Sequence, residues 1–255
     1  MPTKLRIAGA FVGVLLLATG CGPTDQPSSS AAPPPTNATV PATGTAPAPA
    51  AGAMAPLPIS LGANDEAVKI VAEANRLAQA GKLAESVPLF ERALKLNPDD
   101  EETHFNFGFF LNRLGRTNEA ILQYGESLRL LPDYAEAHNN LGNLLLKKGE
   151  FAAAETNFVA AIKTQPQSSS AHNNLGNALA QQGKLPEAVD QFREATRLKP
   201  DYAEAWLNLG NAYVGQGRLQ DAVTPLQTAL QINPRLGPAR NALARVQSRL
   251  AASAK

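Results

Sequence analysis

From residue 67 onward, small and apolar residues return at a fixed interval of 34 residues, and so do glycine and proline. When each of these prolines is counted as position 32, a glycine falls at position 15, and five units result: 67–100, 101–134, 135–168, 169–202 and 203–236. The prolines are Pro98, Pro132, Pro166, Pro200 and Pro234, and the glycines are Gly81, Gly115, Gly149, Gly183 and Gly217. Such a period is typical of architectures in which similar units stack on one another.

Within each unit the pattern predicts two antiparallel helices. Glycine at position 15 accommodates the left-handed geometry that ends the first helix, and proline at position 32 ends the second. Small residues at positions 8, 20 and 27 allow neighbouring helices to approach closely. Asp133 and Asp201, each followed three residues later by a glutamate, are expected to cap the helices that follow them.

This pattern resembles the tetratricopeptide repeat (TPR) family, and the resemblance covers the whole region that we expect to fold. It implies an all-α, right-handed α-solenoid of five helix-turn-helix repeats within residues 64–236. Residues 237–255 resemble one more first helix, with Leu243 and Ala244 at positions 7 and 8. Three arginines make this segment too polar to continue the stack, so we expect a capping helix.

Helical periodicity divides the first helix of each unit into two faces. Positions 4, 7, 8 and 11 hold apolar and small residues and form the packing face, whereas positions 2, 5, 6, 9, 12 and 13 lie opposite. In TPR proteins the opposite face lines a concave groove. Asparagine recurs on it, at position 5 (Asn139, Asn173), position 6 (Asn106, Asn140, Asn174, Asn208) and position 9 (Asn75, Asn143, Asn177, Asn211).

Helix formation does not explain these asparagines, because each one costs about 0.5 kcal/mol relative to alanine in a helix. A side-chain amide both donates and accepts hydrogen bonds, so it pairs with a peptide backbone of any sequence. The pattern is similar to the asparagine ladder in the TPR region of protein O-linked N-acetylglucosamine transferases, which implies a peptide-binding groove. The alternative is recent duplication of near-identical units, with the amides bonded to one another or to water.

The second unit interrupts the asparagine pattern with the sequence "HFNFGFF". Phe105 and Phe109 take positions 5 and 9, four residues apart on the groove face, whereas Phe107 falls on the packing face. With Val71 and Leu146 from the neighbouring units, they are expected to form an apolar pocket that selects a partner's side chain. The alternative is that both rings pack under the N-terminal segment or a neighbouring second helix.

The first 20 residues have the features of an export signal, in which Lys4 and Arg6 precede an apolar stretch too short to span a bilayer. The motif "LATGC" resembles the lipobox of bacterial lipoproteins, which implies acylation of Cys21. Cys21 is the only cysteine, and acylation would remove a free thiol from an exported protein. The alternative is an ordinary signal peptide cleaved near Gly20. In the lipoprotein family, Gly22 in place of aspartate implies sorting to the outer membrane, with the repeats in the periplasm.

Residues 21–63 are rich in proline, alanine, serine and threonine, and Asp25 is their only charged residue. This composition predicts a disordered tether between the membrane and the repeats. Basic and acidic residues are equal in number after the tether, so there is no net positive charge that would attract nucleic acid or anionic lipid.

A row of histidines occupies position 4, at His104, His138 and His172, and Trp206 holds the same place in the fifth unit. Histidines invite a metal-binding interpretation. Position 4 lies on the packing face, however, and successive first helices are about 8–10 Å or more apart, too far for joint coordination of one ion. We therefore expect packing residues and no metal site.

Known catalytic or ligand-binding motifs are not evident in the sequence. It has no phosphate-binding glycine loop or nucleophile elbow, so we predict neither an enzyme nor a bound cofactor. Some TPR domains bind the acidic tails of heat-shock chaperones through basic residues at positions 2, 5 and 6. Here position 2 holds glutamates and positions 5 and 6 hold no base, so this carboxylate clamp is absent.

Together these features predict a membrane-anchored scaffold that binds an extended segment of an envelope protein in the concave groove. The layout is similar to that of outer-membrane TPR lipoproteins that help assemble type IV pilus secretins or organise peptidoglycan enzymes. Two alternatives stay open: a self-associating structural solenoid, and an accessory subunit that delivers substrate to a separate enzyme.

Overall fold

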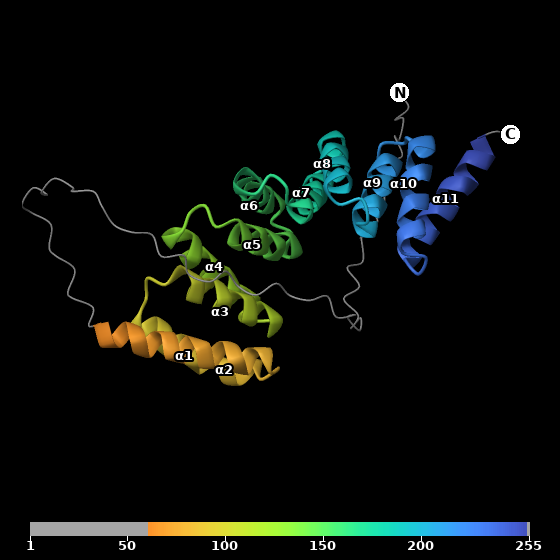
Figure 1. Ribbon diagram of the computed structural model, residues 1–255. Helices are drawn as coiled ribbons and strands as arrows, with labels where there is room; N and C mark the ends of the chain where they lie inside the picture. Colours follow the sequence, from red (N-terminus) through yellow and green to blue (C-terminus); the bar gives the residue numbers. More distant parts are fainter. Residues whose placement is uncertain (1–60, 254–255) are drawn as a thin grey trace, which may run out of the picture. The chain divides into compact units, whose positions relative to one another are not determined.

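The computed structural model describes residues 61–253, which form eleven α-helices (Figure 1). The predicted signal peptide, Cys21 and the tether as far as residue 60 lie outside the described residues. The helices are α1 (Leu61–Gln79), α2 (Leu83–Leu96), α3 (Glu101–Arg113), α4 (Thr117–Leu130), α5 (Ala135–Lys148), α6 (Phe151–Thr164), α7 (Ser169–Gln181), α8 (Leu185–Leu198), α9 (Ala203–Gly215), α10 (Leu219–Ile232) and α11 (Gly237–Ser253).

The helices stack in chain order, from α1 (orange) to α11 (blue) in Figure 1. Each odd-numbered helix from α1 to α9 packs along the helix that follows it, and each pair packs against the next. This arrangement confirms the predicted all-α solenoid of five helix-turn-helix repeats with one final helix. Residues 61–63, assigned to the tether by their composition, belong to α1.

The glycines at positions 15 and 8 have different structural roles. All five glycines at position 15 have φ angles between 76° and 82°, which confirms the predicted left-handed turns. At position 8 the requirement is space. A Cβ atom on Gly176 would lie 2.6 Å from the Phe192 ring, and one on Gly142 would lie 2.7 Å from the Phe158 ring. Close approach of the paired helices therefore depends on a small residue at position 8.

The prediction that Asp133 and Asp201 cap the following helices is wrong. α5 and α9 begin two residues after these aspartates, so the cap positions belong to Tyr134 and Tyr202, whose side chains make no capping hydrogen bond. Asp100, by contrast, directly precedes α3 and accepts a bond of 3.3 Å from the backbone amide three residues on. The aspartates at 133 and 201 stand one residue too early to do the same.

The side chain at position 4 links each repeat to the preceding one. Its ring nitrogen or guanidinium lies 2.7–3.1 Å from the carbonyl oxygen of the proline at position 32 of that repeat. The five pairs are His104–Pro98, His138–Pro132, His172–Pro166, Trp206–Pro200 and Arg240–Pro234. The second ring nitrogen of each histidine bonds an amide oxygen of the paired helix at 2.7–2.9 Å. Both ring nitrogens are thus engaged within the repeat stack, which agrees with the packing interpretation.

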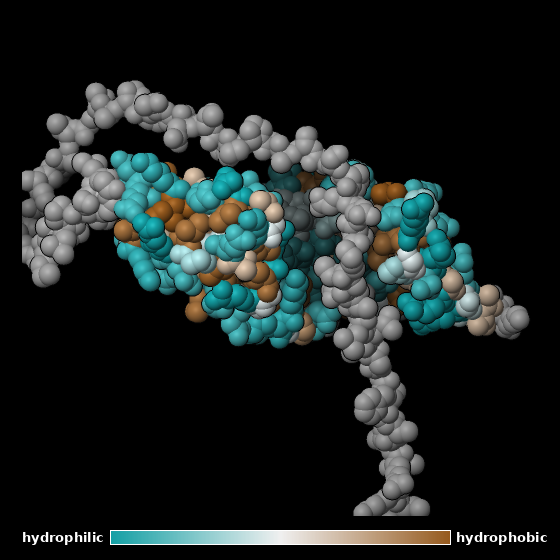
Figure 2. Space-filling view, turned by 90° about the horizontal axis from the view of Figure 1, so that it is seen from below, coloured by the Kyte–Doolittle hydropathy of each residue, from teal (hydrophilic) through white to brown (hydrophobic). Residues whose placement is uncertain are grey.

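The hydrophobic core consists of two clusters that meet at α5. The N-terminal cluster, from α1 to α5, is rich in aromatic residues and includes Phe90, Phe107 and Tyr124. The C-terminal cluster, from α5 to α11, is mainly aliphatic around Phe158 and Phe192. Figure 2, which looks onto α1 and α2, shows hydrophobic residues in patches within a mainly hydrophilic surface. The same fold is therefore filled by different side chains in its two halves.

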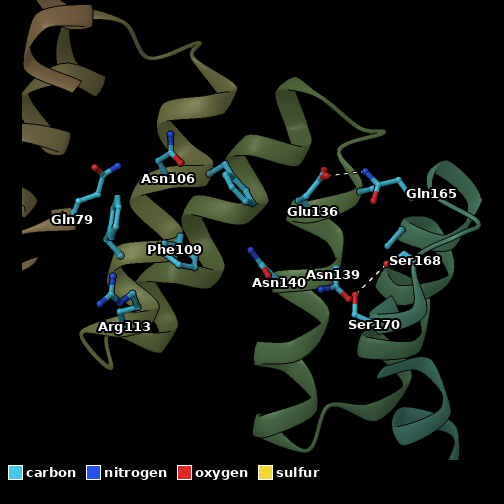
Figure 3. Close-up of a pocket in the computed structure, with 14 residues that line it drawn as sticks. Gln79, Asn106, Phe109, Arg113, Glu136, Asn139, Asn140, Gln165, Ser168 and Ser170 are labelled. Carbon is cyan, nitrogen blue, oxygen red and sulfur yellow. Dashed lines mark hydrogen bonds between the residues drawn. The ribbon is translucent and has the colours of Figure 1, made fainter. Parts of the chain in front are cut away.

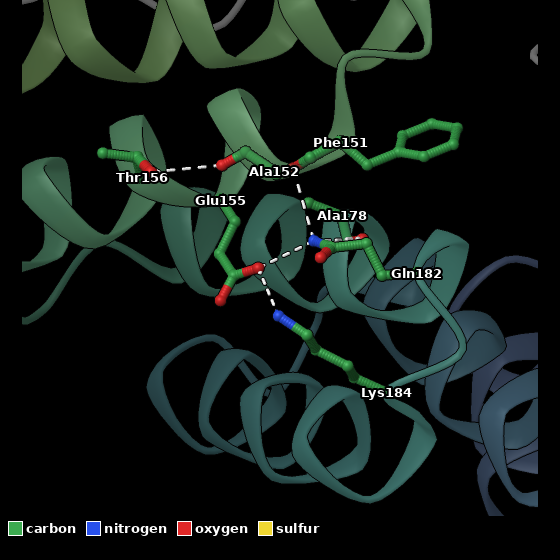
Figure 4. Close-up of polar contacts among 7 residues, drawn as sticks. All are labelled: Phe151, Ala152, Glu155, Thr156, Ala178, Gln182 and Lys184. Carbon is green, nitrogen blue, oxygen red and sulfur yellow. Dashed lines mark hydrogen bonds and ion pairs between the residues drawn. The ribbon is translucent and has the colours of Figure 1, made fainter.

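The contacts between repeats are also more extensive in the C-terminal half. The α6–α7, α8–α9 and α10–α11 interfaces are larger than those between α2 and α3 or between α4 and α5. Figure 4 shows the polar part of one C-terminal interface, where the Glu155 carboxylate accepts hydrogen bonds from Lys184 (2.8 Å) and Gln182 (2.7 Å). These bonds lower the pKa of Glu155 below its ordinary value, and the bond from Lys184 has the larger effect.

Candidate peptide-binding groove

A cavity of about 450 Å³ crosses the groove side of the N-terminal repeats, and we call it the aromatic cavity. Its lining includes five of the residues that the sequence predicted for the groove: Phe105, Asn106, Phe109, Asn139 and Asn140. Gln79 and Arg113 lie at one end of it, and Glu136, Gln165 and Ser170 lie at the other, with Phe109 and Asn140 between them (Figure 3). The cavity therefore extends across the first helices of four successive repeats.

The two phenylalanines of α3 contribute to the cavity in different ways. Phe109 is 41% exposed and meets Phe110 edge-on, with ring centroids 5.3 Å apart. Phe105 is half-buried and packs against Tyr134 (4.8 Å) and Tyr124 (5.8 Å). Phe105 thus forms part of the cavity wall, whereas Phe109 offers free apolar surface. Phe105 therefore packs on a second helix, as the alternative interpretation expected, and it also lines the cavity.

The tyrosines behind Phe105 keep this wall uncharged. Burial raises the pKa of the Tyr124 phenol, and the nearby Asn140 amide offsets only part of that effect. The Tyr124 hydroxyl has no hydrogen-bond partner within residues 61–253. Burial, followed by the charges of Glu136 and other glutamates, raises the pKa of Tyr134 to about 12. Both phenols are therefore neutral at physiological pH.

In the C-terminal half, asparagine amides bond to each other across neighbouring repeats. The Asn174 side chain donates to the Asn139 amide oxygen at 3.1 Å, and Asn208 donates to Asn173 at 3.0 Å. Asn173 is only 4% exposed and also lies 3.5 Å from the Tyr202 hydroxyl. A position-6 amide thus donates to the position-5 amide of the preceding repeat. These asparagines therefore use, within the stack, some of the hydrogen bonds that we expected them to make to a bound peptide.

This amide pairing stops at the second repeat. Position 5 holds Phe105 there and Val71 in the first repeat, so neither Asn140 nor Asn106 faces an amide of the preceding repeat. Phe105 therefore interrupts the ladder at the place where the cavity lies and leaves Asn140 without an inter-repeat amide bond, as Val71 does for Asn106.

The other predicted groove residues lie outside the aromatic cavity. Asn75 lines a smaller hollow of about 170 Å³ together with Val71 and Asn106. Three half-buried asparagines line neither hollow: Asn143, Asn177 and Asn211. The expectation that Val71 and Leu146 extend the phenylalanine pocket is wrong, because Val71 belongs to the smaller hollow and Leu146 packs against the C-terminal cluster.

Several residues that line the cavity were not predicted from the sequence. Gln79 and Arg113 stand at position 13 and Glu136 at position 2, and both positions fall on the predicted groove face. Their place on the helical wheel could therefore have identified them. Gln165 precedes α7 in a connecting turn, where a helical wheel gives no information, and it donates to Glu136 at 2.8 Å.

Comparison with known proteins agrees with the repeat pattern. Sequence profiles described as TPR repeat match residues 110–149, 142–183 and 176–217, and profiles described as tetratricopeptide repeat match residues 89–122 and 203–236. No curated protein sequence matches the chain.

Solved structures are similar to this chain in fold. YrrB, a TPR protein with an unusual peptide-binding site, is 24% identical with a TM-score of 0.63, over 69% of this chain and 91% of YrrB. MamA from Desulfovibrio magneticus, solved from residue 41 to its end, is 20% identical with a TM-score of 0.64, over 68% of this chain and 98% of the solved MamA chain. A thermophilic TPR protein of Thermus thermophilus is 23% identical with a TM-score of 0.53, over 71% and 98% of the two chains. The chain belongs to the tetratricopeptide repeat family, whose members are in general non-enzymatic scaffolds for interactions between proteins.

Proposed function

We propose that this protein is a lipid-anchored scaffold that binds an extended segment of an envelope protein in its concave groove. The observation that carries the proposal is the aromatic cavity, in which Phe109 remains 41% exposed. Apolar rings surrounded by polar groups are the places where binding energy concentrates in protein interfaces. Asn106 and Asn140 line the same cavity and supply amides for the backbone of a bound segment.

The anchor and the location form the second part of the proposal, and they rest on the sequence. The lipobox-like motif supports acylation of Cys21, and Gly22 supports sorting to the outer membrane with the repeats in the periplasm. Within residues 61–253, no helix is long and apolar enough to cross a bilayer. In this proposal the protein is held at its membrane by the lipid.

Partner capture tests the groove. Chemical crosslinking in native membranes, followed by mass spectrometry, identifies the proteins bound to the wild type, and the same capture is then measured for Phe109→Ala. We expect the variant to lose most of the captured partner while its helical circular dichroism signal is unchanged. Leu122→Ala is the matched control, because Leu122 is 65% exposed but does not line the cavity. Equal capture by Phe109→Ala and wild type would contradict binding in this groove.

The anchor is tested separately by intact mass and membrane fractionation. The wild-type chain should carry added acyl mass on Cys21 and sediment with the outer membrane. Cys21→Ser should be released from the membrane or accumulate as unprocessed precursor. A mature, membrane-bound chain with an unmodified Cys21 would refute the lipid anchor without affecting the proposal for the groove.

A further inference from the structure

Among the described residues, Arg113 is an unpaired cation in the wall of the aromatic cavity. Every other arginine from Arg76 to Arg218 forms an ion pair or lies over a tyrosine ring. Arg76, Arg92, Arg116, Arg129, Arg197 and Arg218 pair with carboxylates, and Arg193 lies 6.0 Å from the Tyr213 ring centroid. Near the C-terminus, Arg235, Arg245 and Arg249 also form no ion pair with a described residue, but they do not line the cavity. Arg113 forms no ion pair and no ring contact with any described residue, and its side chain is exposed. Its charge is therefore available to an external group.

The position of Arg113 in its helix does not by itself explain why it lines a cavity. A base in the last turn interacts favourably with the helix dipole, and Arg113 is in the last turn of α3. Lys147 stands at the same repeat position and is likewise in the last turn of its helix, α5, yet it does not line the cavity. The distinguishing feature of Arg113 is thus its place one turn beyond the exposed ring of Phe109.

We propose that the aromatic cavity binds an extended protein segment with a bulky aliphatic or aromatic side chain on Phe109 and a carboxylate on Arg113. This inference rests on the proposed groove function and names the chemistry of its partner. A guanidinium binds a carboxylate through two parallel hydrogen bonds, which gives direction as well as attraction. The arrangement differs from the carboxylate clamp of chaperone-binding TPR domains, because Arg113 stands at position 13 and not at positions 2, 5 or 6.

The spacing of the two side chains fits an extended segment. Residues four apart in a helix are separated by about 6 Å along its axis. Side chains two apart in an extended chain point the same way and are separated by about 6.6 Å. A partner sequence of the form apolar–any–acidic therefore reaches Phe109 and Arg113 together.

Glu136 gives the cavity an opposite charge at its other end, far from Arg113 (Figure 3). Its carboxylate accepts a hydrogen bond from the neutral Gln165 amide, so its negative charge is not neutralised there. A carboxylate at that end of the bound segment would be repelled. The partner segment is therefore oriented, with its acidic residue at the Arg113 end.

The test uses the purified full-length chain and fluorescein-labelled decapeptides of glycine and serine that carry one short motif. The motifs are Leu-Ser-Asp, Leu-Ser-Asn, Leu-Ser-Lys and Ala-Ser-Asp, with Asp-Ser-Leu to determine the chain direction. Fluorescence anisotropy should show that one of the two leucine–aspartate orders binds about two- to fivefold more tightly than the asparagine peptide, as for a partly exposed ion pair. Added salt should reduce this preference. The Ala-Ser-Asp peptide should bind more weakly than the better leucine–aspartate peptide.

Variants at Arg113 make the test specific. Arg113→Gln should remove the preference for aspartate, and Arg113→Glu should transfer it to the lysine peptide. Lys147→Gln, which removes an equivalent base outside the cavity, should keep the wild-type preference. Equal binding of the aspartate, asparagine and lysine peptides to the wild type would overturn the inference and leave groove binding in place. Failure of every peptide to bind would overturn both proposals.

Discussion

The two halves of the solenoid have the same repeat but use their groove positions differently. In the C-terminal half, position-5 and position-6 amides bond to each other, and the contacts between repeats are extensive. In the N-terminal half, Phe105 replaces an amide, and Phe109 and Asn140 line the aromatic cavity. A ladder whose amides bond to each other stabilises the stack, and under the proposed function its interruption provides surface for a partner. We therefore assign a structural role to the C-terminal ladder and a binding role to the N-terminal interruption.

Removing an aromatic ring should have a large effect on stability in the C-terminal core and a small one in the cavity. Phe158 is completely buried, so Phe158→Ala should lower the free energy of unfolding by about 3–5 kcal/mol. Phe109 is 41% exposed, and Phe109→Ala should cost less than about 1 kcal/mol. Chemical denaturation measures both values. Equal losses would mean that Phe109 is a core residue and that the cavity is not a binding surface.

The glycines at position 8 should also respond differently in the two halves. A Cβ atom at Gly176 would lie 2.6 Å from the Phe192 ring, but one at Gly108 would lie 3.1 Å from the Tyr124 ring. Replacing either glycine with alanine gains about 1 kcal/mol of helix propensity, and overpacking costs about 1–3 kcal/mol. Gly176→Ala should therefore be less stable than Gly108→Ala by about 1–2 kcal/mol in thermal unfolding. The opposite order would contradict the tighter packing of the C-terminal half.

The Tyr124 hydroxyl should lower the stability of the N-terminal core, because it is buried and has no hydrogen-bond partner within the described residues. The third and fourth repeats carry Phe158 and Phe192 at the same position. Tyr124→Phe should stabilise the protein by about 1 kcal/mol, since a buried, unsatisfied hydroxyl is removed. The reverse substitution, Phe158→Tyr, should destabilise it. A loss of stability in Tyr124→Phe would show that the hydroxyl makes a favourable bond.

The smallest expected difference in stability is between alanine variants of a paired and of an unpaired asparagine. Replacing either Asn174 or Asn140 with alanine gains about 0.5 kcal/mol of helix propensity. Only Asn174 loses an inter-repeat amide bond, which costs about 0.5–1.5 kcal/mol. Asn174→Ala should therefore be the less stable variant by about 1 kcal/mol in urea unfolding. Identical stabilities would indicate that the amide pair contributes nothing to the stack.

Most of the fold could be predicted from the sequence, because glycine and proline fix the helix ends through backbone geometry alone. The groove face was also predictable, since a helical wheel assigns Asn106, Phe109 and Asn140 to it. The pairing of Asn174 with Asn139 was not, because the pattern shows that amides share a face but not whether they bond to each other. The sequence pattern placed the starts of the helices after Asp133 and Asp201 one residue too early. An error of one residue is enough to assign the N-cap to the wrong side chain.

The distinction between the two halves can be tested most directly by photocrosslinking from one repeat position. p-Benzoylphenylalanine is placed in turn at Phe109, Asn143, Asn177 and Asn211, which all occupy position 9 of their repeats. Each variant is irradiated in intact cells, and the crosslinked partner is quantified by immunoblotting. We predict a strong crosslink to a partner protein at Phe109 and little or none at Asn177 and Asn211. Equal crosslinking at all four positions, or crosslinking confined to the C-terminal two, would contradict a binding role that is concentrated at the interrupted end of the ladder.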